Sequence, residues 1–71
     1  MKDIYTVSLV FGKRKLFNCY EDGKFIGQIR YISHKNGTYS VVYLSHYINE
    51  SLPYEYRAYL SYLVQKKLNI L

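Results

Sequence analysis

The chain has 71 residues, one cysteine and no tryptophan, and its ten basic and five acidic residues give a formal net charge of +5. This length allows one domain at most, and a lone cysteine excludes a disulfide within the chain. We therefore expect a single domain over residues 1–71 that gains stability from packing or from a second subunit. The N-terminus lacks the apolar run of a signal peptide, and no apolar stretch approaches the ~18 residues of a membrane helix, which favours a cytoplasmic protein.

The N-terminal part of the chain predicts two strands joined by a basic turn. Residues 4–11 (IYTVSLVF) are rich in β-branched and aromatic side chains and favour a strand, and residues 16–20 favour a second one. The turn between them carries three consecutive basic residues at positions 13–15. Alternation along the first strand puts these side chains on one face: Tyr5, Val7, Leu9 and Phe11.

Two glycine-containing pairs predict the next two turns. The Asp-Gly pair at 22–23 and the Asn-Gly pair at 36–37 are typical of two-residue hairpin turns, in which both central residues need a positive φ. They border strands predicted over residues 25–33 and 39–47. The sequence therefore predicts an antiparallel meander of three to four strands.

Two-residue loops also determine which side chains share a face of the sheet. They pair Tyr20 with Phe25 and Lys35 with Thr38. The face expected to form the core contains Leu16, Asn18, Tyr20, Phe25, Gly27, Ile29, Tyr31, Val42, Leu44, His46 and Ile48. The opposite face contains Phe17, Cys19, Lys24, Ile26, Gln28, Arg30, Ile32, His34, Tyr39, Val41, Tyr43, Ser45 and Tyr47. This second face is basic and aromatic, and we expect it to lie away from the core.

The last segment predicts one helix, which we expect to begin at residues 51–53 and to end near Leu68. Ser51 can accept a backbone N–H, and Pro53 suits the first turn. The side chains that can cover one sheet face are Tyr56, Leu60, Leu63, Val64 and either Lys67 or Leu68. The predicted fold class is therefore α+β, an antiparallel meander followed by one C-terminal helix packed on one sheet face.

No combination of residues predicts catalysis, a metal site or a cofactor. His34 and His46 fall on opposite faces, where they cannot share a metal ion, and we expect His46 to be half-buried in the core. Cys19 has no activating base or cation beside it, because its expected partner on the next strand is Ile26. The five acidic residues are not placed to share acid-base work. We therefore predict no enzyme and no small-molecule substrate.

The basic and aromatic face has the chemistry of a surface for single-stranded nucleic acid. Tyrosine rings on the fourth strand could stack on bases, and nearby cations could hold phosphates. The net charge of +5 suits an acidic protein surface equally well. Tyrosine is also common on an ordinary wet sheet face. The predicted residues for nucleic-acid or partner binding are Lys13, Arg14, Lys15, Arg30, Tyr39, Tyr43 and Tyr47.

Apolar side chains outside the expected core predict a homodimer. The chain is small and lacks a disulfide, so a second subunit is a ready source of stability. The predicted interface residues are Ile26, Ile32, Val41, Tyr43, Tyr54 and Tyr62. The sequence thus favours a non-enzymatic, homodimeric binding module. The alternative is a single-stranded nucleic-acid-binding protein that uses the basic, tyrosine-rich sheet face.

Two resemblances bear on this interpretation. The expected order of four strands and then a helix is similar to that of whirly single-strand-binding modules, which implies binding of single-stranded nucleic acid. The Lys-, Ile- and Tyr-rich composition resembles that of small proteins from phages and prophages of low-GC bacteria, or from archaeal viruses. Neither resemblance assigns a role to a particular residue.

Overall fold

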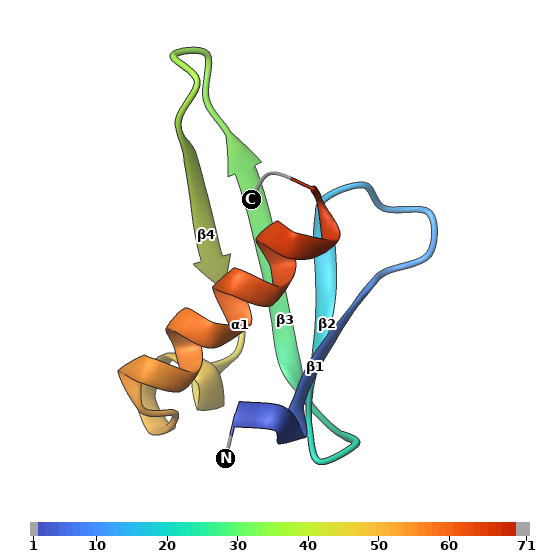
Figure 1. The fold of residues 1–71 in the computed structure, drawn as a ribbon, viewed down its shortest axis with the longest axis vertical. Helices are drawn as coiled ribbons and strands as arrows, with labels where there is room; N and C mark the ends of the chain where they lie inside the picture. Colours follow the sequence, from blue (N-terminus) through green and yellow to red (C-terminus); the bar gives the residue numbers. More distant parts are fainter. Residues whose placement is uncertain (1, 70–71) are drawn as a thin grey trace.

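The computed structural model describes residues 2–69, which form a four-stranded antiparallel sheet with one helix lying across one face (Figure 1). The strands lie in the sheet in chain order, β1-β2-β3-β4. This arrangement confirms the predicted α+β class. The elements are η1 (Lys2–Ile4), β1 (Tyr5–Leu9), β2 (Leu16–Glu21), β3 (Lys24–Ser33), β4 (Tyr39–Tyr43), η2 (Tyr47–Ser51) and α1 (Tyr54–Lys67).

The core lies between α1 and the sheet face that this helix covers. The predicted stripe of α1 supplies one side of it, with Leu60 and Val64 completely buried. Each large apolar side chain buried in this way contributes about 1.5–3 kcal/mol, so the stripe holds the helix on the sheet. The buried core residues are Tyr5, Val7, Phe17, Cys19, Ile29, Ile48, Leu52, Leu60 and Val64.

The chain enters α1 later than the sequence predicts. β4 ends at Tyr43, and a π-helical turn, η2, includes residues expected to end the strand and to cap the helix. Ser51 closes that turn, and Pro53 precedes α1 without a side-chain capping bond. The predicted cap at Ser51 is therefore wrong. The turn forms here because the side chain of Ile48 is completely buried in the core.

The turn between β3 and β4 is one residue longer than predicted. The His34 amide donates to the Thr38 carbonyl (2.8 Å), which leaves three residues between the paired positions instead of two. Asn36 stabilises this longer turn, because its side-chain oxygen accepts from the amide (3.2 Å) and from the hydroxyl (2.6 Å) of Thr38. A shift of one residue turns every side chain of a strand to the other face.

This shift corrects the predicted faces of the fourth strand. Tyr43 pairs with Ile29, and both Tyr43 and Val41 pack against the core beneath α1. Val42 and Leu44 are instead exposed on the opposite face of the sheet. The prediction that put Val42 and Leu44 in the core, and Val41 and Tyr43 outside it, is wrong because it assumed the shorter turn.

A β-bulge in β3 also changes the predicted faces of β2. The residues that flank the turn at 22–23 pair as predicted, but the register then shifts, and Cys19 pairs with Gly27 rather than Ile26. Cys19 and Phe17 therefore turn into the core instead of facing away from it. The sheet face opposite α1, here called the uncovered face, carries Thr6, Ser8, Leu16, Asn18, Tyr20, Phe25, Gln28, Arg30, Ile32, Ser40, Val42 and Leu44.

Gly27 lies where the chain leaving β4 crosses back over the sheet. A Cβ atom at this position would overlap the Cβ and Oγ atoms of Ser45 and would lie 3.2 Å from Cδ1 of Ile48. Its φ of 144° also disfavours any residue with a side chain. The Ser45 hydroxyl donates to the Ile26 carbonyl (2.8 Å), so the segment after β4 is held directly against the bulge.

Replacement of Gly27 by alanine should lower the free energy of unfolding by about 3 kcal/mol or more, because the new methyl group must displace Ser45 and Ile48. Gly12→Ala is the matched control. Gly12 has a φ of 79°, but a Cβ there would meet no atom within 4 Å. Backbone strain alone should cost that variant about 1–2 kcal/mol. Urea denaturation measures both changes, and equal losses would contradict the close packing of Ser45 on Gly27.

Candidate functional site

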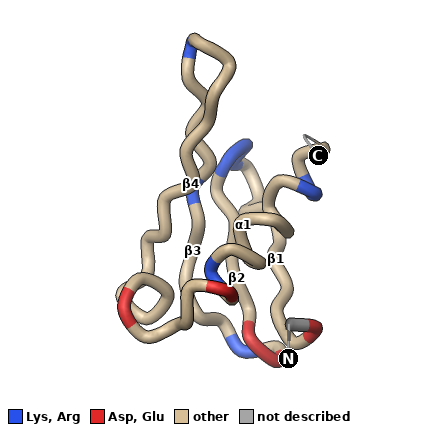
Figure 2. Tube along the Cα trace, turned by 60° about the vertical axis from the view of Figure 1, so that its left-hand side comes forward, with Lys and Arg blue, Asp and Glu red and all other residues tan. Residues whose placement is uncertain are grey.

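The charged residues are distributed unevenly along the long axis of the molecule (Figure 2). One end holds the β1–β2 loop, the β3–β4 hairpin tip and the last turn of α1. Seven of the ten basic residues lie toward this basic end: Lys13, Arg14, Lys15, Arg30, Lys35, Lys66 and Lys67. All five acidic residues lie toward the opposite, acidic end: Asp3, Glu21, Asp22, Glu50 and Glu55. Within residues 2–69, an anion that approaches the basic end therefore meets no Asp or Glu side chain there.

The four basic residues predicted to bind a partner meet in one groove. Lys13, Arg14 and Lys15 line it from the β1–β2 loop, and Arg30 lines it from β3. The groove has a volume of about 560 Å³ and is here called the basic groove. Its remaining lining consists of Leu16, Tyr31, Ile32 and Ser33.

The basic groove forms where β2 stops and β3 continues. Strand pairing ends with Leu16 opposite Arg30, and the Tyr31 amide makes one further bond to the Lys15 carbonyl (2.9 Å). The last residues of β3 then pair only with β4 in the described part of the chain. Leu16 and Arg30 belong to the uncovered face, whereas alternation puts Lys15 and Tyr31 on the face that α1 covers. The groove therefore wraps round the free edge of the sheet.

Aromatic rings lie beside these cations. The Nζ atom of Lys15 is 5.9 Å from the centre of the Tyr31 ring and donates to the Ser33 hydroxyl (2.9 Å). Tyr31 stacks on Tyr39, with ring centres 5.2 Å apart and ring planes at 28°. Phe11, from the same loop as the cations, is 100% exposed. The basic end therefore offers free ring faces next to positive charge.

Phe11 and Tyr31 belong to this site but are not among the binding residues predicted from the sequence. Phe11 is predicted to end the first strand and Tyr31 to lie on the core face of the third, but β1 ends at Leu9 and β3 extends beyond β2. The signal that could have identified Phe11 is its place immediately before Gly12 and a run of cations, where a strand is expected to end. No local sequence signal shows that β3 extends beyond β2. This extension exposes Tyr31 to the groove.

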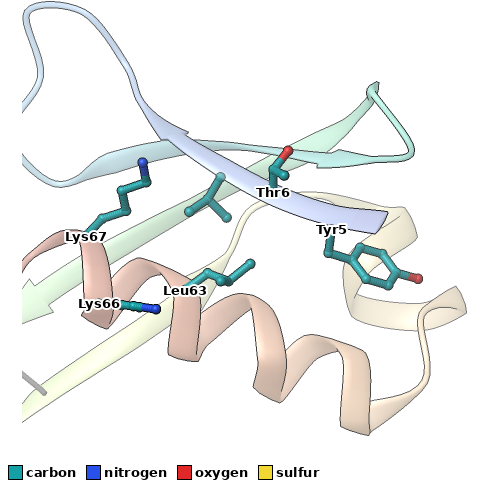
Figure 3. Close-up of a pocket in the computed structure, with 6 residues that line it drawn as sticks. Tyr5, Thr6, Leu63, Lys66 and Lys67 are labelled. Carbon is teal, nitrogen blue, oxygen red and sulfur yellow. The ribbon is translucent and has the colours of Figure 1, made fainter. Parts of the chain in front are cut away.

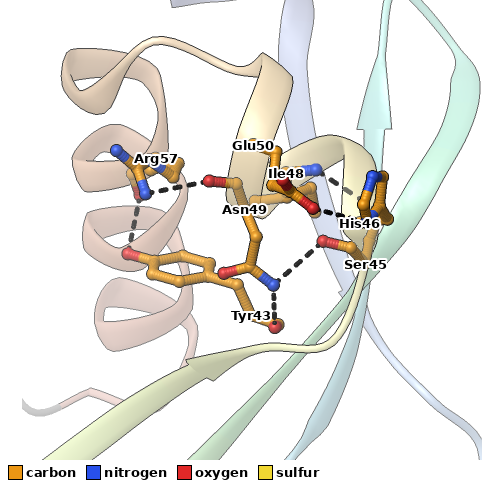
Figure 4. A network of polar contacts seen from close by, with 7 residues as sticks. All are labelled: Tyr43, Ser45, His46, Ile48, Asn49, Glu50 and Arg57. Atoms are coloured by element: carbon orange, nitrogen blue, oxygen red, sulfur yellow. Dashed lines mark hydrogen bonds and ion pairs between the residues drawn. The ribbon is translucent and has the colours of Figure 1, made fainter.

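Tyr43, a predicted binding residue, has a structural position instead (Figure 4). Its hydroxyl donates to the Arg57 carbonyl in α1 (3.1 Å), and its carbonyl accepts from the Asn49 side chain (2.6 Å). Arg57 in turn donates from Nη1 to the Asn49 carbonyl (3.3 Å). Burial raises the pKa of the Tyr43 hydroxyl. These bonds join β4, η2 and α1, and they keep Tyr43 out of the basic groove.

Tyr47, also predicted to bind, lies toward the acidic end. Its hydroxyl is 3.2 and 3.3 Å from the two carboxylate oxygens of Glu21, one of which also accepts from Tyr5 (2.6 Å). Burial, followed by the Glu21 charge and hydrogen bond, raises the pKa of Tyr47. Of the three tyrosines on the predicted binding face, the structure thus brings only Tyr39 to the basic end.

The residues predicted for a dimer interface do not form one patch. Ile26, Val41 and Tyr43 pack against the core, Ile32 lies on the uncovered face, and Tyr54 and Tyr62 are exposed on α1. The uncovered face does expose large apolar side chains, with Phe25 at 54% and Leu44 at 47%. The homodimer stays a prediction, and the uncovered face is the sheet surface that could form its interface.

The histidines are tied to other surface groups. His46 is exposed, which corrects its predicted half-buried position, and its Nδ1 atom lies 2.7 Å from the Glu50 carboxylate. The Nε2 atom of His34 lies 2.8 Å from the Ser40 hydroxyl. Within residues 2–69, no group of three or more His, Cys, Asp and Glu side chains could hold a metal ion.

Comparison with protein-family models, with curated proteins and with solved structures finds no match for this chain. In the part of the chain that the structure describes, no helix has both the length and the apolar character needed to cross a membrane. The geometry and charge of the basic end are therefore the features from which a function can be inferred.

Cys19 is completely buried, and burial raises the pKa of its thiol from 9.0 to about 12. Near neutral pH this cysteine stays protonated, so it lacks the reactivity of a catalytic thiolate. Above pH 9.0 the unfolded chain releases the proton that the folded chain retains. The free energy of unfolding should therefore fall as the pH rises from 9.0 toward 12.

Urea denaturation between about pH 8 and about pH 11 should show this fall, with a Cys19 contribution of at most about 1.4 kcal/mol per pH unit. Cys19→Ala should be less stable near neutral pH but should lose less stability with rising pH, because the buried thiol no longer titrates. A thiol reagent should label Cys19 only after unfolding. Identical pH slopes in the two proteins would contradict burial of the thiol as the cause.

Proposed function

We propose that this chain is a non-enzymatic binding protein whose basic end holds a single-stranded nucleic acid. The observation that carries the proposal is the separation of charge, with seven basic residues and none of the five acidic residues toward that end. Such an arrangement attracts a polyanion over a distance and orients it before contact. Release of counterions from the phosphates then supplies much of the affinity.

Aromatic rings next to the cations favour a nucleic acid over other polyanions. The outer ring of the Tyr31–Tyr39 stack and the free ring of Phe11 can each receive a base. One base stacked on an aromatic ring contributes about 1–3 kcal/mol. A polyanion without bases would gain nothing from these rings.

The shape of the basic groove favours a single strand over a duplex. The groove wraps round one sheet edge, with Arg30 toward the uncovered face and Lys15 toward the other. A flexible strand can follow this bend with its phosphates at the loop cations and its bases on Tyr39 and Phe11. A rigid duplex keeps its base faces stacked inside, where these rings cannot reach them.

The loop cations should set the salt dependence of binding. We expect the affinity for an oligothymidylate to fall steeply as the salt concentration rises. The triple variant, with alanine in place of Lys13, Arg14 and Lys15, should reduce the slope of log affinity against log salt by about 2, because each lost phosphate contact contributes about 0.7. Lys24→Ala, a charge change toward the acidic end, is the control and should leave the slope unaltered. Fluorescence anisotropy titrations at several salt concentrations measure both slopes.

The rings should contribute affinity that is independent of salt. Phe11→Ala and Tyr39→Ala should each weaken binding by roughly 5- to 150-fold, the range that corresponds to one lost stacked base, without changing the salt slope. Phe25→Ala removes an equally bulky exposed ring far from the basic end and is the matched control. Equal losses at Phe25 and Phe11 would contradict the assignment. Absence of binding to any single strand at low salt would remove the proposed function itself.

A further inference from the structure

One edge of the sheet, the outer side of β1, has no strand partner within residues 2–69. The Val10 amide donates to the Leu16 carbonyl (2.8 Å), and the Ile4 carbonyl accepts from the Asp22 amide (2.7 Å). Backbone groups alternate in direction along an antiparallel strand, so the N–H and C=O groups of Val7 and Leu9 point away from β2. They are free to pair with another strand.

This edge lacks the features that keep other edge strands from pairing. Natural edge strands usually carry a charged residue, a proline or a bulge, or are covered by another segment. The sequence of β1, YTVSL, has no charge and no proline, and its register with β2 is continuous over residues 5–9. The edge is therefore suited to accept an added strand.

A groove runs beside the same edge on the side of α1 (Figure 3). It has a volume of about 400 Å³ and lies between Tyr5, Thr6 and Val7 of β1 and Leu63, Lys66 and Lys67 of α1. Lys67 extends from the last turn of the helix toward β1 (Figure 3). A strand added to β1 would direct every second side chain into this groove. The groove offers such side chains an apolar surface at Leu63 and positive charge at the two lysines.

We propose that an extended, acidic segment of a partner protein binds here as a fifth strand beside β1. Its backbone pairs with the free groups of Val7 and Leu9, one apolar side chain rests against Leu63, and acidic side chains meet Lys66 and Lys67. Within residues 2–69, no Asp or Glu side chain lines the groove to compete with a partner for these lysines.

A second copy of this chain is a poorer occupant of the edge. Two β1 strands paired antiparallel about Val7 would bring the Lys66 and Lys67 turns of both helices toward the same seam. Like charges would then face each other, and β1 itself supplies no carboxylate to offset them. This site is separate from the basic groove and does not depend on the proposed binding of nucleic acid.

The test uses the acetylated and amidated peptide TETVTET, which presents Glu, Val and Glu on one face of a strand, and the matched peptide TKTVTKT. NMR-detected hydrogen exchange reports on the edge directly. At saturation the acidic peptide should slow exchange of the Val7 and Leu9 amides by at least about tenfold, because both enter new hydrogen bonds. The amides of Thr6 and Ser8, which already bond to β2, should change little. The lysine peptide should have no effect.

Charge reversal gives the second arm of the test. The double variant Lys66→Glu with Lys67→Glu should no longer bind the acidic peptide and should bind the lysine peptide instead. Lys35→Glu, the same change at the hairpin tip, should still bind the acidic peptide and not the lysine peptide. No slowing with the acidic peptide, or equal binding of both peptides, would overturn the proposal. Slowing that grows with protein concentration in the absence of peptide would overturn it in favour of a second copy.

Discussion

The contact of Ser45 and Ile48 with the bare backbone of Gly27 is the constraint on which the rest of the structure depends. It holds the segment after β4 against the bulge of β3, and the same bulge turns Phe17 and Cys19 of β2 into the core. From this crossing the chain passes through η2 and into α1, which then runs back over the sheet toward β1. The position of the helix, and with it the covered face of the sheet, follows from this one close approach.

Separation of charge is a consequence of the antiparallel topology. Successive turns of a meander alternate between its two ends, so the β1–β2 loop and the β3–β4 hairpin share one end while the β2–β3 turn and η2 share the other. The helix continues the pattern, with Glu55 in its first turn and Lys66 and Lys67 in its last. Each charge complements the helix dipole at its position. The arrangement that stabilises α1 therefore also concentrates cations at the end proposed to bind an anionic partner.

Much of the fold follows from local sequence, whereas the faces of the sheet do not. The strands, the hairpins and the end of α1 are predictable from propensity and turn residues, and so is the cation cluster at positions 13–15. The faces depend on register, where a single residue matters. The Asn36 side chain lengthens one turn, and the bulge beside Cys19 shifts the other pairing. The longer turn, held by a contact between residues only two apart, moves Tyr43 from the predicted binding face to a position beneath the helix. The bulge, against which Ser45 packs from the far side of the hairpin, turns Phe17 and Cys19 into the core.

Binding at the basic end is the central claim, and a map of amide chemical shifts tests it most directly. On titration with a single-stranded oligonucleotide at low salt, the largest changes should cluster at residues 11–15, at residues 30–33 and at Tyr39. Residues of the acidic end, such as Glu21 and Tyr47, should remain unaffected. Changes centred on Tyr43 and Tyr47, or no changes at all, would contradict the account.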